Sequence, residues 1–180
     1  CSFGIIDCDK VAREVSGVGS PCLNELVLEF SNSILNEDKS LNRKALGKIV
    51  FFNKACLTRL NEITHPYILK QVSIIIKELS TSFPIIVVDA PTLFESGADH
   101  LCDKVLSIIA KDEVTIPRIM KRDLVDEASA RNRLNSQHDA SFFIEHSDFI
   151  VQNDGEKQEF LDALSDIVKK IEECANGNSN

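Results

Sequence analysis

Four short runs of apolar residues constrain the fold of this chain more than any other feature. They are Phe3 to Ile6, Pro84 to Val88, Lys104 to Ile109 and Asp148 to Asn153. Each has the length of a strand that is buried on both faces, and three of the four are rich in Val and Ile. Segments with helical periodicity separate the runs. This alternation predicts an α/β fold in which helices flank a parallel sheet.

The interval between the first two runs, residues 20–82, has a helical pattern and no convincing strand. Apolar periodicity indicates helices that start at Pro21 and at Ser40. A further helix is expected to start at His65, because Pro66 fits a first helical turn. We therefore expect a helical subdomain to be inserted between the first and second strands.

The segment from Asp112 to His146 is again helical in pattern and is rich in Arg and Asp. Pro117 lies inside its first helical run. Because a proline removes a backbone hydrogen bond and clashes with the preceding turn, this helix is expected to begin near Ile116 or to kink there.

Size and charge limit the classes of function. A chain of 180 residues suits a single domain, 1–180, and its net charge of -8 argues against nucleic acid as a partner. No apolar stretch approaches the ~20 residues of a membrane span, so no membrane partner is expected. The six cysteines form no C-x-x-C pair, which favours a cytoplasmic protein with inert, mostly buried thiols and argues against a zinc site.

Two acids, Asp7 and Asp9, stand at the end of the first predicted strand, and Arg13 follows one helical turn later. Residues i and i+2 of a strand point to the same side, and ligands bind at the carboxyl ends of parallel strands. One carboxylate could take a proton from a hydroxyl group, while the other holds a water molecule on a metal. A polar stop followed by a helix cap explains the two acids equally well.

Asp89 ends the second predicted strand in the sequence VVDAPTLFESG, and Glu95 follows six residues later. A strand-terminal aspartate orients Mg²⁺ in many phosphoryl-transfer enzymes. The alternative is that Asp89 merely caps the next element.

Arginines at helical spacing form the third candidate group. Arg118 and Arg122 are spaced i, i+4, as are Arg133 and Gln137, so each pair is expected on one helix face. The planar guanidinium suits phosphate. The commoner explanation of such pairs is a solvated face with surface ion pairs.

Two predicted helix starts, at Ser40 and at Thr64, would expose backbone N–H groups that attract anions, although capping alone also explains both residues. The sequence contains no G-x-x-x-x-G-K-[ST] pattern. Its single Gly-Lys pair, at Gly47 and Lys48, is followed by Ile49 and lies in a predicted helix.

In order along the chain, these pieces resemble the dephospho-coenzyme A kinases. The matching segments run from residue 1 to about residue 155 and read IIDCDKVAREV, GSPCL, LNRKAL, HPYI, VVDAPTLFESG, CDKVL, RIMKRD, RNRLNSQ and SDFIVQNDG. The resemblance implies a P-loop kinase fold of three α/β/α layers, related to the nucleotide monophosphate kinases. It also implies a helical substrate subdomain at 20–82 and a lid at 124–147.

The same resemblance implies the function and the role of each residue. The family transfers the γ-phosphoryl group of ATP, with Mg²⁺, to the ribose 3′-hydroxyl of dephospho-CoA. Asp9 matches the general base of the family, and Asp89 matches a residue on the metal-binding side of the site. The residues that match the acceptor side are Asp7, Arg13, Asn42, Arg43, His65 and Glu95. Those that match the nucleotide and lid side are Arg118, Arg122, Arg133 and Gln137.

Two departures from the family pattern leave alternatives open. The glycine-rich loop does not precede IIDCD, and Phe143 stands where the lid usually carries a basic residue. Because the sole methionine is Met120, we expect an N-terminally truncated copy. Without the glycine-rich loop, this copy is expected to be inactive by itself. We also expect it to be a monomer or a weak oligomer. The alternatives are a non-catalytic protein that binds a ligand or a partner, and a kinase of another small acceptor such as a nucleoside monophosphate.

Overall fold

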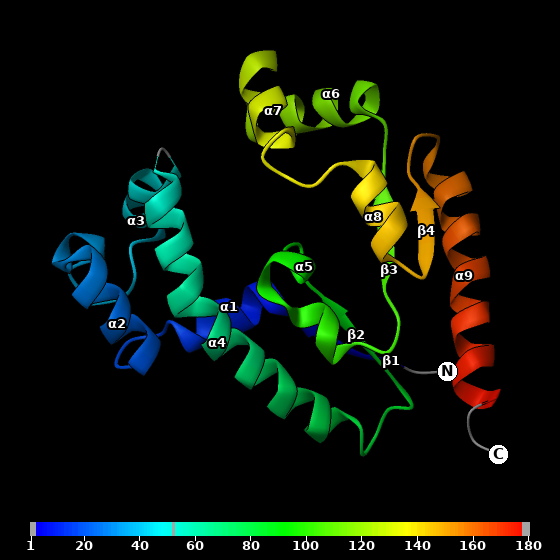
Figure 1. Ribbon diagram of the computed structural model, residues 1–180, viewed down its shortest axis with the longest axis horizontal. Coiled ribbons are helices and arrows are strands. Elements are labelled where there is room, and N and C mark those ends of the chain that lie inside the picture. Colours follow the sequence, from blue (N-terminus) through cyan, green and yellow to red (C-terminus); the bar gives the residue numbers. More distant parts are fainter. Residues whose placement is uncertain (1–2, 52, 178–180) are drawn as a thin grey trace. The chain divides into compact units, whose positions relative to one another are not determined.

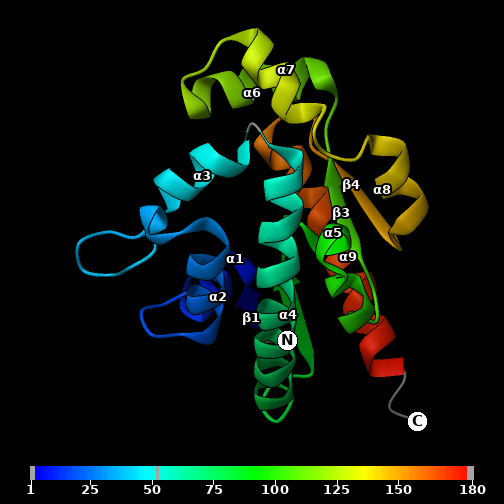
Figure 2. The same ribbon diagram turned by 60° about the vertical axis from the view of Figure 1, so that its left-hand side comes forward.

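The computed structural model describes residues 3–51 and 53–177, and its chain divides into two compact units, 1–102 and 103–180. Figures 1 and 2 show the elements of each unit. Those of the first are β1 (Phe3–Asp7), α1 (Cys8–Val15), α2 (Pro21–Phe30), a 3-10 turn (Asn32–Ile34), α3 (Arg43–Phe51), α4 (Lys54–Leu79), β2 (Ile85–Asp89), α5 (Leu93–Ser96) and a second 3-10 turn (Ala98–Leu101).

The second unit also combines strands with helices. Its elements are β3 (Leu106–Ile109), α6 (Asp112–Asp123), α7 (Glu127–Leu134), α8 (Ala140–His146), β4 (Phe149–Gln152) and α9 (Lys157–Gly177). The four predicted strands are thus confirmed to within a residue or two. Among the described residues, no helix is both long enough and apolar enough to cross a membrane.

Both sheets described consist of one parallel pair of strands. In the first unit β1 pairs with β2, with Phe3 opposite Ile85, and in the second β3 pairs with β4, with Leu106 opposite Phe149. In each pair the strands are separated in sequence by helices, as a parallel connection requires. The predicted α/β class with parallel strands and flanking helices is therefore confirmed.

Helix α4 organises the first unit, because it contributes to both apolar clusters there. Near its start, Ile63 packs with residues of α2, α3 and the first 3-10 turn. Further along, Val72 is fully buried against Ile6 of β1 and Val11 of α1. Figures 1 and 2 show α4 running from α3 to the β1–β2 pair. The strands and the helical insertion therefore share one long helix.

The approach of α4 to β1 depends on Gly4. A Cβ atom at this position would lie 3.2 Å from side-chain atoms of both Leu79 and Phe83. The opposite face of the pair is open, since Ile5 is 71% exposed and Val87 is 44% exposed. The expectation that these strands are buried on both faces is thus wrong for the described residues, because α4 covers only one face.

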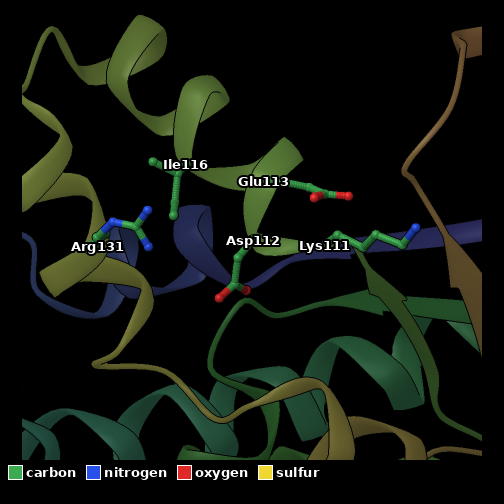
Figure 3. Close-up of a pocket in the computed structure, with 5 residues that line it drawn as sticks. All are labelled: Lys111, Asp112, Glu113, Ile116 and Arg131. Carbon is green, nitrogen blue, oxygen red and sulfur yellow. The ribbon is translucent and has the colours of Figure 1, made fainter.

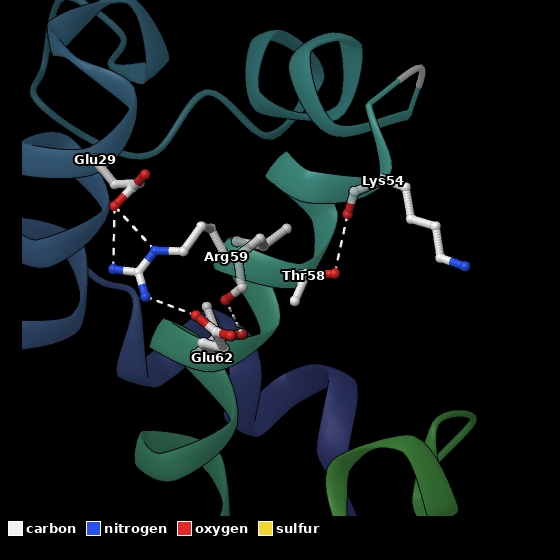
Figure 4. A network of polar contacts seen from close by, with 7 residues as sticks. Glu29, Lys54, Thr58, Arg59 and Glu62 are labelled. Atoms are coloured by element: carbon white, nitrogen blue, oxygen red, sulfur yellow. Dashed lines mark hydrogen bonds and ion pairs between the residues drawn. The ribbon is translucent and has the colours of Figure 1, made fainter.

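Polar contacts also join α2 to α4 (Figure 4). The Arg59 guanidinium donates to Glu29 of α2 at 3.1 Å and to Glu62 of α4 at 2.6 Å. On the same helix the Thr58 hydroxyl donates to the Lys54 carbonyl oxygen at 3.0 Å. The ion pairs orient α2 relative to α4. Because they are exposed, the apolar cluster supplies most of the stability of this contact.

The two described helices with a proline in their interior, α4 and α6, begin at other residues than predicted. Pro66 lies inside α4 rather than at a helix start, so the helix expected to start at His65 is part of a longer helix that begins at Lys54. Pro117 lies inside α6, which begins at Asp112 and not near Ile116. In α4 the burial of Ile63 on one side of the proline and Val72 on the other holds the helix together, although Pro66 cannot donate a backbone hydrogen bond.

The thiols are less buried than expected. Among the cysteines that the structure describes, Cys22 is buried and Cys174 is exposed, while Cys8, Cys56 and Cys102 are half-buried; none of these five forms a disulfide. Cys1, which was also predicted to be inert, lies outside the described residues.

Candidate active site

The carboxyl ends of β1 and β2 bring Asp7 and Asp89 opposite each other in the strand register. The prediction that Asp9 shares the strand face of Asp7 is wrong, because the strand ends at Asp7 and α1 starts at Cys8. Asp9 instead lies in the first turn of α1. The Asp7 carboxylate accepts a hydrogen bond from the Lys10 backbone N–H at 3.0 Å, so Asp7 is the N-cap of this helix.

The negative charge at these strand ends affects the pKa of the Cys8 thiol. Burial raises its pKa to about 11, and the charges of Asp89, Asp7 and Asp9 add to the shift. No three His, Cys, Asp or Glu side chains in residues 3–51 and 53–177 are placed to hold a metal ion by themselves.

A cavity of about 100 Å³ lies beside these strand ends, between α1, α4 and the loop after β2. Its ionisable groups include Asp9 and His65, and its hydroxyls include those of Thr64 and Thr92. The remaining lining is mostly apolar and comes from Cys8, Ala12, Ile68, Leu69, Val72, Ala90, Pro91, Ser96 and Ala98. A small cavity with a few convergent polar groups is typical of a ligand site.

His65 reaches this cavity from the middle of α4. Its pKa is lowered by burial, and the negative charge of Glu95 partly opposes that effect. The predicted helix start at Thr64 is wrong, because Thr64 lies inside α4 and its hydroxyl donates to the Leu60 carbonyl oxygen at 2.9 Å. Thr64 therefore offers no helix N-terminus to an anion, and His65 is the ionisable side chain that α4 contributes to the cavity.

Two arginines meet at the other end of α1. The Arg43 guanidinium donates to the buried hydroxyl of Ser16 at 2.8 Å, one turn after Arg13. Burial lowers the pKa of Arg43, and the positive charge of Arg13 lowers it further. Asp9 also lies within electrostatic range of Arg43. Two guanidiniums within electrostatic range of each other form an arrangement that suits an anionic ligand.

The start of α3 is capped by Asn42 and not by Ser40. The Asn42 side-chain oxygen accepts from the Ala45 backbone N–H at 2.9 Å. Ser40 lies in the preceding turn, where its hydroxyl donates to Asp38. The prediction that Ser40 starts this helix is therefore wrong, whereas the proposed site residues Asn42 and Arg43 do stand at its beginning.

The predicted nucleotide-side residues all lie in the second unit. Arg118 donates to the Asn153 carbonyl oxygen at 2.7 Å, whereas Arg122 and Arg133 both bind Asp123. Gln137 does not share a helix face with Arg133, because α7 ends at Leu134. That prediction of helical spacing is wrong, since the chain turns after α7.

Comparison with known proteins identifies the group to which the chain belongs. The model of the dephospho-CoA kinase family matches residues 1–159. The chain belongs to the dephospho-CoA kinase family.

Relatives from distant organisms agree with this dephospho-CoA kinase assignment. The chain is 38% identical over 176 residues to a dephospho-CoA kinase of Saccharomyces cerevisiae, with 93% of this chain and 72% of the relative covered. It is 34% identical over 168 residues to one of Lactobacillus johnsonii, with coverage of 93% and 85%.

Solved structures agree as well. A dephospho-CoA kinase from Campylobacter jejuni superposes with a TM-score of 0.68 and 32% identity, covering 98% of this chain and 87% of the other. The protein TT1252 from Thermus thermophilus, which is 22% identical, shares the fold with a TM-score of 0.71, over 94% of this chain and 85% of that one.

This dephospho-CoA kinase family member also has a hollow that sequence reasoning missed (Figure 3). It measures about 460 Å³ and lies at the start of α6 and on α7. Its lining residues are Lys111, Asp112, Glu113, Ile116 and Arg131. In Figure 3 the side chains of Asp112 and Arg131 extend toward the space below Ile116. These residues form no motif, so the sequence holds no signal for the hollow.

Phe143, at the position where the resemblance led us to expect a basic residue, takes part in an aromatic cluster. Its ring packs edge-on to Phe142, with centroids 5.7 Å apart. Phe142 in turn stacks on His138 at 3.8 Å and on His146 at 4.1 Å. Position 143 thus contributes apolar packing to α8.

Proposed function

We propose that this chain, when joined to a glycine-rich phosphate-binding loop, carries out ATP-dependent phosphorylation of the ribose 3′-hydroxyl of dephospho-CoA. The observation that carries the proposal is the cavity that joins Asp9 to His65 beside the strand ends, in a chain of this family. In this proposal residues 20–82 form the acceptor-binding subdomain, residues 124–147 form the lid, and the two belong to a single kinase domain.

Asp9 acts as the general base. The oxygen of the ribose 3′-hydroxyl attacks the γ-phosphorus of ATP, and the bond from that phosphorus to the β,γ-bridging oxygen breaks to release ADP. The hydroxyl proton passes to the Asp9 carboxylate. The position of Asp9 on the cavity wall, in the first turn of α1, supports this role, since it leaves the carboxylate beside the space for a hydroxyl group.

The acceptor is oriented by residues of α1, α3 and α4. Arg13 and Arg43 bind the diphosphate of dephospho-CoA, because their like charges lie close together and an anion between them relieves the repulsion. His65, held by α4 and facing the charge of Glu95, contacts the ribose in the cavity. Asn42 places Arg43 by capping α3.

The donor side requires Mg²⁺ and a phosphate-binding loop. Asp89, opposite Asp7 in the strand register, is the residue that would hold the ion through water, and half of the Asp7 carboxylate is already engaged as a helix cap. When bound, Mg²⁺ neutralises charge on the β- and γ-phosphate oxygens. Arg118, Arg122, Arg133 and Gln137 contribute the nucleotide and lid contacts.

A second candidate concerns residues 1–180 taken alone, which contain no G-x-x-x-x-G-K-[ST] pattern. Such a polypeptide would lack the backbone N–H groups that cradle the β- and γ-phosphates. It would bind a CoA-like ligand or a partner without chemistry.

One experiment separates these candidates. Residues 1–180 and a version preceded by the glycine-rich loop segment of a relative are each incubated with ATP, Mg²⁺ and dephospho-CoA, and CoA is quantified by chromatography. We expect CoA from the second polypeptide only. Robust 3′-phosphorylation by residues 1–180 would show that the phosphate site lies elsewhere, and a preference for AMP as acceptor would contradict the CoA assignment.

A further inference from the structure

The carboxylate of Asp123, at the end of α6, receives hydrogen bonds from two arginines. Arg122 donates through Nε to one oxygen at 2.8 Å and through Nη2 to the other at 3.0 Å. Arg133 of α7 donates through Nη1 to the second of these oxygens. The Asp123 side chain is only 18% exposed, while those of Arg122 and Arg133 are 75% and 39% exposed. The carboxylate is therefore shielded, and both guanidiniums remain open to solvent.

The charge of Asp123 decides what this cluster can do. The hydrogen bond from Arg122 lowers the pKa of Asp123, and the positive charges of both arginines lower it further, so the group stays ionised. Without the carboxylate, two like charges would repel each other across the α6–α7 contact. With it, the three side chains keep one net positive charge. Such a cluster is held in place and still attracts an anion.

We propose that Asp123 is a positioning residue that holds Arg122 and Arg133 together as a binding site for the phosphate chain of the nucleoside triphosphate. The proposal rests on the kinase function proposed above. Arg122 uses two of its five N–H groups on Asp123, so donors remain on both guanidiniums for phosphate oxygens. Asp123 itself touches no substrate and acts through the two arginines.

A purely structural role for Asp123, as a clamp between α6 and α7, makes a different prediction. Such a clamp would affect the stability of this unit and would not discriminate between the two substrates. The chain offers a matched control in the Arg131–Glu127 pair of α7, where Nε and Nη2 donate to one carboxylate oxygen at 3.0 and 2.7 Å. Breaking that pair removes a comparable ion pair and leaves Arg122 and Arg133 in place.

The test compares Asp123→Asn with Glu127→Gln in the catalytically active protein. A hydrogen bond between charged groups is worth enough that its loss changes affinity by roughly 10-fold. We expect Asp123→Asn to raise the KM for ATP by about 10-fold, with the KM for dephospho-CoA changed by less than about 2-fold. Glu127→Gln is expected to leave both values within about 2-fold, and Asp123→Glu to restore part of the ATP affinity.

Calorimetric titration measures affinity without turnover. The two ligands are ATP and inorganic tripolyphosphate, which has the phosphate chain but no nucleoside. In a protein that already carries Arg122→Gln and Arg133→Gln, adding Asp123→Asn should cause no further loss of affinity. A further loss there, an equal rise in both KM values, or a lower Tm with unchanged affinity would overturn the proposal.

Two further outcomes are also decisive. If Asp123→Asn fails to fold, the titrations are made with Arg122→Gln and Arg133→Gln, and unchanged affinity for tripolyphosphate in both would reject the site. If the wild type binds ATP but does not phosphorylate dephospho-CoA, the proposed function fails. The positioning role of Asp123 still stands in that case, provided that Asp123→Asn weakens ATP binding.

Discussion

Asp7 and Asp89 face each other at the carboxyl ends of the parallel strands β1 and β2. The two carboxylates have different local environments, because Asp7 accepts the backbone N–H of Lys10 whereas Asp89 ends its strand before a loop. Hence Asp7 stabilises the fold as a helix cap. In the proposed mechanism, Asp89 is the carboxylate that uses its oxygens to hold Mg²⁺ on the ATP side through water.

The first prediction concerns this cap. Replacing Asp7 by alanine removes the acceptor for the Lys10 N–H and is expected to lower the free energy of unfolding by about 1 kcal/mol. Asp7→Asn keeps an acceptor oxygen and should cost clearly less. Urea unfolding of both variants measures the difference, and equal losses would contradict the capping role.

The second prediction tests the general base. Asp9→Asn in the active protein is expected to lower kcat by about 100- to 10,000-fold, because the amide cannot accept the hydroxyl proton, while the affinity for ATP stays the same. Steady-state kinetics and an ATP titration provide the two readouts.

Glu14→Gln is the control for Asp9→Asn, since it removes an exposed carboxylate from the same helix at a position that does not line the cavity. Near-normal turnover of Asp9→Asn would exclude Asp9 as the base, and Asp7 would then be tested next.

The third prediction concerns pH and His65. Burial lowers the pKa of His65 in the folded state below its ordinary value of 6.5, so the unfolded chain takes up a proton first as the pH falls. The contribution to stability is complete above about pH 6.5 and is lost as the pH drops from there through the folded-state pKa. His65→Gln should therefore flatten the decrease in unfolding free energy below pH 6.5.

The matched control is His100→Gln, because the His100 side chain is 87% exposed. Urea unfolding between pH 5 and 8 should show the altered slope for His65→Gln only. An unchanged slope in that variant would mean that His65 titrates normally in the folded protein.

The fourth prediction concerns thiol reactivity. A pKa of about 11 in place of 9.0 leaves Cys8 about 100-fold less thiolate at neutral pH, and the higher nucleophilicity of that thiolate offsets part of the effect. We expect iodoacetamide to modify Cys8 about 10-fold more slowly than a free thiol of ordinary pKa. Mass spectrometry of a time course should show the exposed Cys174 modified first. Equal rates for the two would contradict the raised pKa of Cys8.

The fifth prediction uses the backbone at the end of α6. Leu124 has a φ of 54°, in the left-handed region, and its side chain is 91% exposed. Leu124→Gly is expected to stabilise the protein by about 0.5–1 kcal/mol, because glycine adopts this conformation without steric cost. Leu28→Gly, at an 86% exposed position inside α2, should instead destabilise it by about 1 kcal/mol. Thermal unfolding showing the same sign for both would reject this explanation.

Local sequence determined the strands, the class of fold and the first helix of the insertion. The alternation of apolar runs and helical segments predicts the parallel pairs, and the apolar periodicity from Pro21 predicts the start of α2, where the Ser20 hydroxyl accepts the Leu23 N–H at 3.1 Å. These features depend on neighbours within one or two turns, so pattern and propensity suffice to find them. The ordered motifs also indicated the family that the comparisons show.

Tertiary structure alone decided where helices continue and which distant side chains meet. α4 passes through Pro66 because packing on both sides of the proline outweighs the lost hydrogen bond. Arg43 binds Ser16 across 27 residues of sequence, and Asp9 shares a cavity with His65 of α4. Asp123 joins Arg133 to Arg122 only because α6 and α7 pack together. Such contacts depend on the burial of apolar faces over the whole chain, and the pattern of any single segment contains no record of its partner.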